Sequence, residues 1–385
     1  MTGLGRRARS GRGRITLAIA VMTFLSACST DPGHGEPGAT AIPSGTLKQA
    51  CGPKLVLQTD WFPEPEHGGS YQLIGPSGRI DKKRGTYSGE IRKTGVELEI
   101  RAGGPYIGNQ PVTSLMYQDD DIFMGYVTTD EAVRHSRAQP TVAVFAPLAN
   151  SPSALMWDPA KYSFKSLRDI GRSRAKVVYF EGTAFIDYLV GKGFIRRDQL
   201  DPSYDGSPSR FVAEGDVVQE AFATHEPYKY EHDLPQWRKP VAFLLVSTGG
   251  YQPYPQNVAV RPETLRAKRA CLRALVPLMQ QAQVDYIENP EPVNRALLRI
   301  VAEITSPWTL SEGGVADAVK KMVDLKIVDN GRDGAIGSFD MARIHQVIQI
   351  LKPIYARQRG ATMNPGVTPG DVVTNEFIDR GVHFP

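Results

Sequence analysis

The sequence has few cysteines and no cluster of histidines. Three cysteines among 385 residues are too few for a fold built on disulfides or for a cysteine-ligated iron cluster. The seven histidines show none of the close spacings that zinc sites use. The run Asp119-Asp120-Asp121 is acidic, but consecutive carboxylates do not converge on one ion without a dedicated loop. We therefore expect no metal and no cofactor.

Neither sign of charge dominates, and long apolar runs are also lacking. The 45 Lys and Arg and 41 Asp and Glu leave a formal charge of +4, part of which lies in arginines before residue 15. The rest of the chain is therefore close to neutral, which argues against nucleic acid as a partner. The apolar run at residues 15–26 is shorter than the ~20 residues of a membrane-spanning helix, and no later run is a better candidate.

The first 28 residues have the order of a bacterial lipoprotein signal. Arginines precede the apolar run, which ends in Leu25-Ser26-Ala27-Cys28. Small residues before a cysteine are typical of the site where the signal is cleaved and the thiol is lipidated. We expect residues 1–27 to be removed and Cys28 to anchor the chain on the extracytoplasmic side of the cell membrane. An ordinary secretory signal is the alternative, and Arg6-Arg7 leaves open twin-arginine rather than Sec export.

Beyond Cys28 the composition changes again. Residues 28–50 are rich in Pro, Gly, Ser and Thr and have little to bury, which predicts a flexible tether. Residues 51–385 exceed the usual size of one domain and suggest two lobes. In an oxidising compartment Cys51 and Cys271 could pair, but the sequence does not show whether they approach each other.

Short apolar segments alternate with amphipathic ones in most of this region. The alternation predicts α/β layers with largely parallel sheets, and helical spacing of apolar residues after Pro262 predicts a mostly helical C-terminal third. The polar, glycine-punctuated residues 75–95 predict an inserted hairpin or loop. The expected strands are residues 54–58, 96–100, 121–126, 141–146, 154–157, 176–180 and 240–246, and residues 187–192 and 217–224 are expected helices.

The loop after the first expected strand carries an unusual set of side chains. Residues 60–69 read Asp-Trp-Phe-Pro-Glu-Pro-Glu-His-Gly-Gly, with two prolines that stiffen the backbone. Ligands bind at the carboxyl ends of parallel strands, which is where this loop would lie. We interpret it as a ligand-binding loop; the alternative is a surface turn whose Trp61 and Phe62 pack into the core.

This loop and three later segments resemble the family of binding proteins for thiamine-pyrimidine precursors, sulfonates and nitrate. The later segments are Ser166-Leu167-Arg168-Asp169-Ile170, Thr224-His225-Glu226-Pro227-Tyr228 and Thr374-Asn375-Glu376-Phe377-Ile378. The resemblance implies a type II periplasmic-binding-protein fold, with two α/β lobes, a central cleft and two crossovers. The sequence departs from the family at Glu64, where asparagine is usual, and at residues 75–95, which interrupt the helix after the first loop.

The resemblance also implies an organisation and a set of partners. Lobe I would comprise residues 51–150 and 248–385 and lobe II residues 151–247, with crossovers near residues 150–154 and 245–251. The protein would be a monomer that closes its lobes on a small molecule and delivers it to an ABC permease with a cytosolic ATPase. It would reach the membrane only through its lipid and would catalyse no reaction.

The expected site favours an amine-bearing ligand. Sulfonate and nitrate sites need converging donors, usually including Arg or Lys, whereas these loops supply carboxylates and aromatic rings. They suit a flat heterocycle such as a thiamine-pyrimidine precursor, ahead of a riboflavin-like compound and of a sulfonate or nitrate. Several of these positions could equally be plain turns, helix caps or surface charges. The predicted ligand-binding residues are Asp60, Trp61, Phe62, Glu64, His67, Gly125, Tyr126, Pro147, Glu181, Gly182, Thr183, Glu226 and Tyr251.

Two other classes of function are compatible with the resemblance. A lipoprotein of this fold could act as a ligand sensor that presents its bound form to a partner. Some relatives of the fold synthesise the thiamine pyrimidine and use one of their own histidines, for which His67 would be the candidate here. The export signal and the lack of a cysteine cluster for iron argue against the enzyme.

Overall fold

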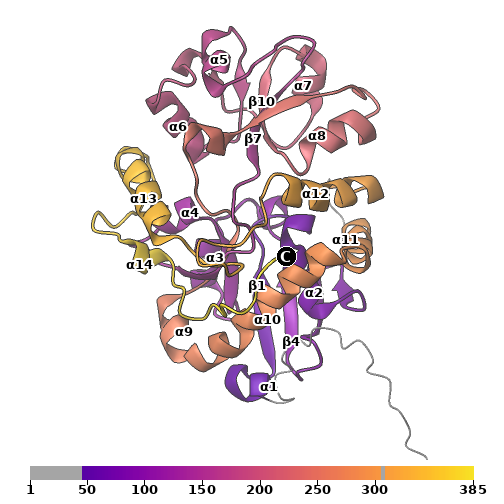
Figure 1. Cartoon of the computed structure of the whole chain (residues 1–385), viewed down its shortest axis with the longest axis vertical. Helices are drawn as coiled ribbons and strands as arrows, with labels where there is room; N and C mark the ends of the chain where they lie inside the picture. The colour runs from indigo at the N-terminus through magenta and orange to yellow at the C-terminus, as the bar shows by residue number, and fades with distance from the viewer. Residues whose placement is uncertain (1–45, 305–307) are drawn as a thin grey trace, which may run out of the picture. The chain divides into compact units, whose positions relative to one another are not determined.

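Two β-sheets organise the protein, whose computed structural model describes residues 46–304 and 308–385. The first sheet has the strand order β2-β3-β4-β1-β5-β12-β6 and the second the order β11-β7-β10-β8-β9. In Figure 1 the second sheet and helices α5 to α8 occupy one end of this region, and the first sheet lies below them. The expected lipid-bearing Cys28 and the signal before it lie outside the described residues.

The first sheet is parallel at its centre and antiparallel at both sides. Strand β1 pairs in parallel with β4 and β5, whereas β12 runs antiparallel between β5 and β6. Its strands are β1 (Lys54–Gln58), β2 (Arg79–Asp81), β3 (Thr86–Glu90), β4 (Glu97–Arg101), β5 (Met124–Val127), β6 (Val142–Phe145) and β12 (Asn257–Val260).

The second sheet is mixed in the same way. Strand β8 pairs in parallel with β9 and β10, and β7 runs antiparallel to β10 and β11. Its strands are β7 (Ser153–Trp157), β8 (Val177–Val178), β9 (Leu200–Asp201), β10 (Val218–Phe222) and β11 (Ala242–Leu245). The expected α/β architecture is confirmed, with fewer parallel pairs than the sequence predicts.

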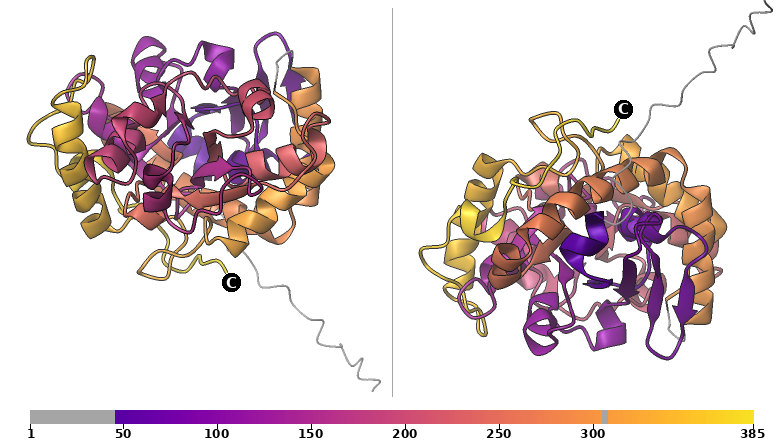
Figure 2. Two further views of the ribbon diagram at one scale, coloured as in Figure 1. Left: turned by 90° about the horizontal axis from the view of Figure 1, so that it is seen from above. Right: turned by 90° about the horizontal axis from the view of Figure 1, so that it is seen from below.

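Helices cover both sheets, and the C-terminal part is mostly helical, as predicted. Seen from below in Figure 2, the orange and yellow C-terminal helices surround the indigo start of the described chain. The helices are α1 (Thr46–Cys51), α2 (Gly68–Ile74), α3 (Val112–Gln118), α4 (Thr129–Arg134), α5 (Leu167–Arg172), α6 (Ala184–Gly191), α7 (Ser209–Glu214), α8 (Glu226–Tyr228), α9 (Pro262–Ala267), α10 (Arg269–Glu288), α11 (Glu291–Glu303), α12 (Glu312–Asp324), α13 (Met341–Tyr355) and α14 (Pro369–Val372).

Two predictions of secondary structure are wrong. The apolar spacing of residues 217–224 predicts a helix, but residues 218–222 form strand β10, because both edges of this segment pair with neighbouring strands. The predicted tether ends too late, since residues 46–50 belong to helix α1. Leu47 of that helix is fully buried, and Cys51 at its end forms a disulfide with Cys271 of α10, with a Cα–Cα distance of 4.7 Å.

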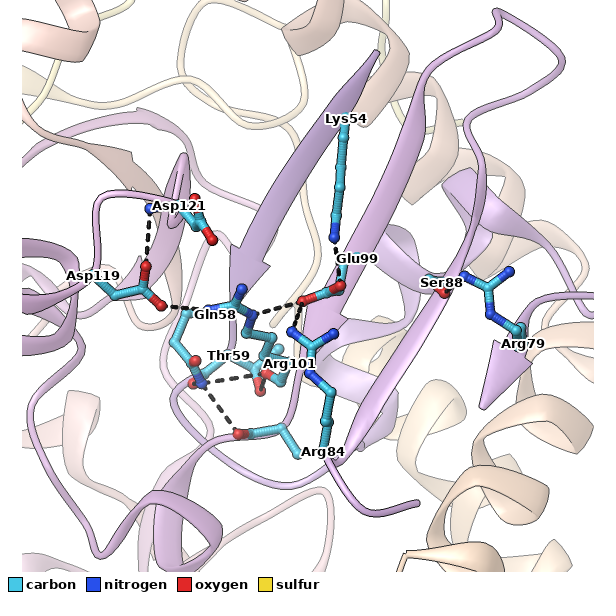
Figure 3. A network of polar contacts seen from close by, with 11 residues as sticks. Lys54, Gln58, Thr59, Arg79, Arg84, Ser88, Glu99, Arg101, Asp119 and Asp121 are labelled. Atoms are coloured by element: carbon cyan, nitrogen blue, oxygen red, sulfur yellow. Dashed lines mark hydrogen bonds and ion pairs between the residues drawn. The ribbon is translucent and has the colours of Figure 1, made fainter. Parts of the chain in front are cut away.

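The inserted residues 75–95 form the hairpin β2–β3, which extends the first sheet beyond β4. A buried carboxylate ties the hairpin to the sheet (Figure 3): Glu99 accepts hydrogen bonds from Lys54 (2.7 Å), Arg84 (3.1 Å) and Arg101 (2.8 Å). Burial opposes the charge of Glu99, but the bonds from Lys54 and Arg101 lower its pKa below the ordinary value. Asp119 of the acidic run pairs with the same Arg101, at 2.7 Å.

The chain crosses twice between the sheets. It passes from β6 to β7 through residues 146–152 and returns from β11 to β12 through residues 246–256. Arg343 of α13 binds both crossovers, because its guanidinium donates to the carbonyl oxygens of Ala149 (2.6 Å), Gln252 (2.6 Å) and Pro253 (2.9 Å). In the described part of the chain, no helix is long and apolar enough to cross a membrane.

Candidate functional site: an acidic and aromatic cleft

A cavity of about 570 Å³ opens where the carboxyl end of β1 faces the second sheet. The loop after β1 supplies one wall, and the segments after β8, β9 and β10 supply the opposite one. We call it the first cavity, and its lining includes Asp60, Trp61, Phe62, Glu64, Phe180, Tyr204, Glu220, Phe222, His225, Glu226, Lys229, Gln256 and Trp308.

A second cavity of about 400 Å³ adjoins the first. It extends toward α4 and the return crossover, where Thr128, Asp130 and Tyr251 contribute to its lining, and Thr183 before α6 lines it as well. The residues that line both cavities form their common boundary: Asp60, Trp61, Glu220, Phe222 and Gln256.

Hydrogen bonds among buried groups hold the loop after β1. His67 is fully buried and its Nε2 lies 2.8 Å from Asp60 Oδ1. Gln256 donates through Nε2 to Glu64 (2.7 Å) and to Asp60 (3.4 Å). The His67 ring packs 4.5 Å from the ring of Tyr126. His67 and Tyr126 therefore support the loop from behind, and neither lines a cavity.

Three glycines allow close approach around this loop. A Cβ on Gly68 would lie 2.1 Å from the ring of Tyr286, and one on Gly69 would lie 2.0 Å from the side chain of Gln283. Helix α2 can therefore pack directly against α10. Gly104 has a φ of +61°, and a Cβ there would lie 2.6 Å from the Trp61 ring. Trp61 is thus held between backbone on one side and the cavity on the other.

Aromatic rings form one side of the first cavity. Trp61 meets Phe62 at 5.9 Å and Phe180 of the opposite wall at 6.2 Å, both edge to face. Trp308 stacks on Phe62 at 6.0 Å and on His225 at 4.3 Å. Rings from both sides of the cleft can therefore contact a flat ligand.

Two carboxyl groups line the first cavity opposite the loop after β1, and they belong to Glu220 of β10 and Glu226 of α8. Glu220 accepts from the backbone N–H of Phe180 at 2.8 Å, and Glu226 accepts from that of Phe222 at 2.7 Å. Burial raises the pKa of each carboxyl group to about 7. Burial also raises the pKa of Glu64 well above its ordinary value, with the nearby Glu66 and Asp60 adding to the effect. A cationic group placed among these carboxyls would favour their ionised forms.

Positive charge is scarce in the same place. Among the described residues that line the first cavity, Lys229 is the only lysine or arginine. Burial lowers the pKa of His225 to about 3, with Lys229 adding to the effect, so this imidazole is neutral at physiological pH. Within residues 46–304 and 308–385, no three His, Cys, Asp or Glu side chains are grouped so as to hold a metal ion.

The predicted site residues divide into those the structure brings to the cavities and those it does not. Asp60, Trp61, Phe62, Glu64 and Glu226 line the first cavity, and Gly182, Thr183 and Tyr251 line the second. Phe62 is at once buried, at 3% exposure, and part of the lining. Thr183 precedes helix α6 without capping it, and its hydroxyl donates instead to Glu220 at 3.3 Å.

The remaining predicted residues lie elsewhere, for identifiable reasons. Strand β5 continues to Val127, so Gly125 and Tyr126 lie within it rather than in the loop after it; Gly125 packs on Val112, and the hydroxyl of Tyr126 lies 2.8 Å from Ser70. Pro147 is buried in the first crossover, and Glu181 is exposed outside both cavities.

Glu66 has a different role from the other acids of its loop. Its carboxylate accepts a hydrogen bond from the hydroxyl of Thr224, which follows β10 in the second sheet. Both side chains are buried, at 2% and 1% exposure, and neither lines a cavity. This bond joins the segment after β1 to the segment after β10.

Sequence reasoning missed several residues of the site, among them Glu220, Gln256 and Trp308. Glu220 was assigned to a helix, although the β-branched pair Val217-Val218 before it is also typical of a strand. Gln256 and Trp308 lie in segments without a recognisable motif. Gln256 lies on the return crossover, and Trp308 donates from its indole N–H to the carbonyl of Pro63 at 3.2 Å. Only the fold shows that they meet the loop after β1.

The fold is that of a type II periplasmic binding protein. Solved structures similar to this chain include an alkanesulfonate-binding protein of Xanthomonas axonopodis, with TM-score 0.51 and 12% identity over 84% of this chain and 98% of the other. A nitrate-binding protein of Synechocystis aligns with TM-score 0.52 and 10% identity over 84% and 87%. An ABC transporter protein of Parabacteroides distasonis aligns with TM-score 0.50 and 8% identity over 83% and 98%.

Comparisons of sequence add nothing to this similarity of fold. No family model matches the chain, and no curated protein matches it. At 8 to 12% identity, the neighbours establish the architecture but not the ligand.

The raised pKa values predict that the free protein loses stability as pH rises. Burial raises the pKa of Glu131, Glu220 and Glu226 from 4.5 to about 7. The folded state therefore holds these protons more tightly than the unfolded chain, so the stabilisation is complete below pH 4.5 and is lost as pH rises through about 7. In this interval we expect the free energy of unfolding to fall by about 1.4 kcal/mol per pH unit for each group.

Urea unfolding at several pH values between 5 and 7.5 measures this slope. Glu220→Gln removes one of the groups whose pKa is raised, so its slope should be shallower than that of the wild type. The same slope in both proteins would contradict the assignment of a raised pKa to Glu220.

Proposed function

We propose that this chain is an extracytoplasmic solute-binding lipoprotein of an ABC importer that captures a flat, amine-bearing heterocycle. The observation that carries the ligand class is the first cavity, where aromatic rings face Glu220 and Glu226 and Lys229 is the only lysine or arginine among the described lining residues. Rings stack on a heterocycle, and carboxylates accept from its amine. A thiamine-pyrimidine precursor has both features.

The remaining parts of the proposal concern export and delivery. The lipobox at Leu25–Cys28 supports a lipid anchor on the outer side of the membrane. The two crossovers, linked by Arg343, support closure of the lobes around the ligand. The closed monomer would then dock on a permease whose cytosolic ATPase drives import, and the protein itself would catalyse no reaction.

A second ligand class is favoured by the size of the site. Cavities of about 570 and 400 Å³ that share a boundary offer more room than one pyrimidine ring needs. A larger heterocycle with a polar side chain, such as a riboflavin-like compound, would fill both. A sulfonate or nitrate, as bound by two of the neighbours named above, would instead lack converging cationic donors in the first cavity.

A thermal-shift panel tests the proposal. The mature chain is screened against aminopyrimidines, thiamine, riboflavin, taurine, alkanesulfonates and nitrate, because a ligand that binds the folded state raises the melting temperature. We expect a shift with an aminopyrimidine or a flavin. Trp61→Ala should weaken binding about 10- to 100-fold, since it removes a stacking ring.

Two outcomes would contradict parts of the proposal. A shift with sulfonate or nitrate alone would keep the importer and overturn the ligand class. No shift with any compound would favour a sensor or a different ligand. Tyr117→Ala is a suitable control for Trp61→Ala, because it removes an aromatic side chain that lines neither cavity.

A further inference from the structure

Gln256 combines three features that are unusual for one side chain. It is only 2% exposed, yet it lines both the first and the second cavity. Its side-chain oxygen Oε1 is buried without a hydrogen-bond partner. Its backbone has a φ of +46°, the left-handed region that residues other than glycine seldom adopt.

The orientation of the Gln256 amide follows from its neighbours. Its Nε2 donates to Glu64 Oε1 at 2.7 Å and lies 3.4 Å from Asp60 Oδ1. The reversed amide would place Oε1 against these carboxyl oxygens, where only a protonated Glu64 could donate to it. A bound cation favours the ionised form of Glu64 and therefore the orientation with Nε2 toward it. The acceptor Oε1 is therefore the part of the amide that is left for another partner.

A buried acceptor without a hydrogen-bond partner destabilises the folded state. Strained backbone also costs free energy, and it is found most often at functional sites, where the surrounding structure holds it. Both features occur here on the residue at the boundary between the two cavities. An N–H group of a bound ligand would satisfy Oε1. A Ser or Thr hydroxyl would be less selective, because it can both donate and accept, whereas a fixed amide oxygen only accepts.

We propose that Gln256 selects the ligand by accepting a hydrogen bond, at Oε1, from an N–H group located at the boundary of the two cavities. This inference rests on the proposed binding of a heterocycle. The ligand must then present N–H donors on two sides, one toward Glu220 or Glu226 and one toward Gln256. Heterocycles in which an acceptor replaces that N–H are rejected.

The position of Gln256 in the chain gives the bond a second consequence. Gln256 is the last residue of the return crossover and directly precedes β12 of the first sheet. A ligand bound to its amide is therefore linked to the segment that moves when the lobes close. The same crossover is joined to Arg343 through Gln252 and Pro253, a few residues before Gln256.

Isothermal titration with two pyrimidines of similar size tests the role of Oε1. The probes are 4-amino-2-methylpyrimidine, which has N–H donors, and 4-methoxy-2-methylpyrimidine, which has none. We expect the wild type to bind the amino compound about 100-fold more tightly than the methoxy compound. In Gln256→Met this ratio of affinities should fall to about tenfold. Gln256→Glu, which keeps an acceptor, should retain most of the preference even where its affinity falls.

Asn257 provides the matched control. It is a buried amide of 1% exposure whose Oδ1 also has no partner, but it lines neither cavity. Asn257→Leu should lower stability and leave the preference for the amino compound unchanged. A preference in Gln256→Met within twofold of the wild type would overturn the role of Gln256 alone. Binding of neither pyrimidine by the wild type would overturn the aminopyrimidine ligand class together with this role.

Discussion

Replacing both Glu220 and Glu226 by glutamine should reduce the affinity for a cationic heterocycle about 100- to 20,000-fold. Hydrogen bonds to a charged group contribute about 1.5–3 kcal/mol each, so the loss of two corresponds to about 3–6 kcal/mol. Glutamine preserves the size of the side chain and can still accept from the backbone N–H groups of Phe180 and Phe222. The change therefore removes charge more than shape.

The titration is best measured at pH 8. The pKa of both carboxyl groups is about 7 in the free protein, so both are largely ionised at that pH. Because a cation favours the ionised forms, binding should weaken in the wild type as pH falls from 8 to 6, and protons should be released on binding. The double variant should show little of this pH dependence.

A control for charge lies close by in the chain. Glu181 lies between β8 and α6, on the same side of the cleft as Glu220 and Glu226, but it is exposed and lines neither cavity. Glu181→Gln should bind the heterocycle as the wild type does. Affinity within threefold of the wild type in the Glu220→Gln/Glu226→Gln variant would show that these carboxylates do not recognise the ligand.

The disulfide predicts a large effect on stability and little effect on binding. Cys51 and Cys271 are 220 residues apart, so their bond closes a long loop in the unfolded chain. The chain-entropy relation gives about 5 kcal/mol for a loop of this length. Cys51→Ala/Cys271→Ala should lower the free energy of unfolding in urea by up to about this amount.

The same variant should keep its ligand affinity within about threefold. The disulfide joins α1 to α10 before the amino end of β1, whereas the cavities lie beyond the carboxyl end of that strand. A reductant should lower the melting temperature of the wild type and leave that of the double variant unchanged. Equal stability of the two proteins under oxidising conditions would contradict a bond that restrains the unfolded chain.

The loop after β1 shows which features of the site can be predicted from residues close together in the sequence. Trp61, Phe62 and Glu64 line the first cavity, because the loop directly follows an apolar strand whose carboxyl end faces the cleft. His67 belongs to the same run but lies behind it, bonded to Asp60. Sequence identifies such a loop, and packing decides which of its side chains face a ligand.

Strand register explains the other differences. Gly125 and Tyr126 were expected after a strand that in fact continues to Val127, so the loop that borders the second cavity begins at Thr128. Glu220 lies in residues 217–224, whose apolar spacing also fits a helix, so the sequence did not predict that it lines a cavity. Pairing of β10 with both β7 and β8 decided in favour of the strand and turned Glu220 toward Thr183.

The sequence alone predicted seven of the strands, the mostly helical C-terminal part, the place of the insertion and the aromatic-acidic loop, because each depends on residues close together in the chain. Tertiary structure decided the pairing of Cys51 with Cys271 and the meeting of Gln256 and Trp308 with that loop. These contacts join segments about 190 to 250 residues apart. No local pattern encodes them, because they depend on how two crossovers bring separate strand ends together.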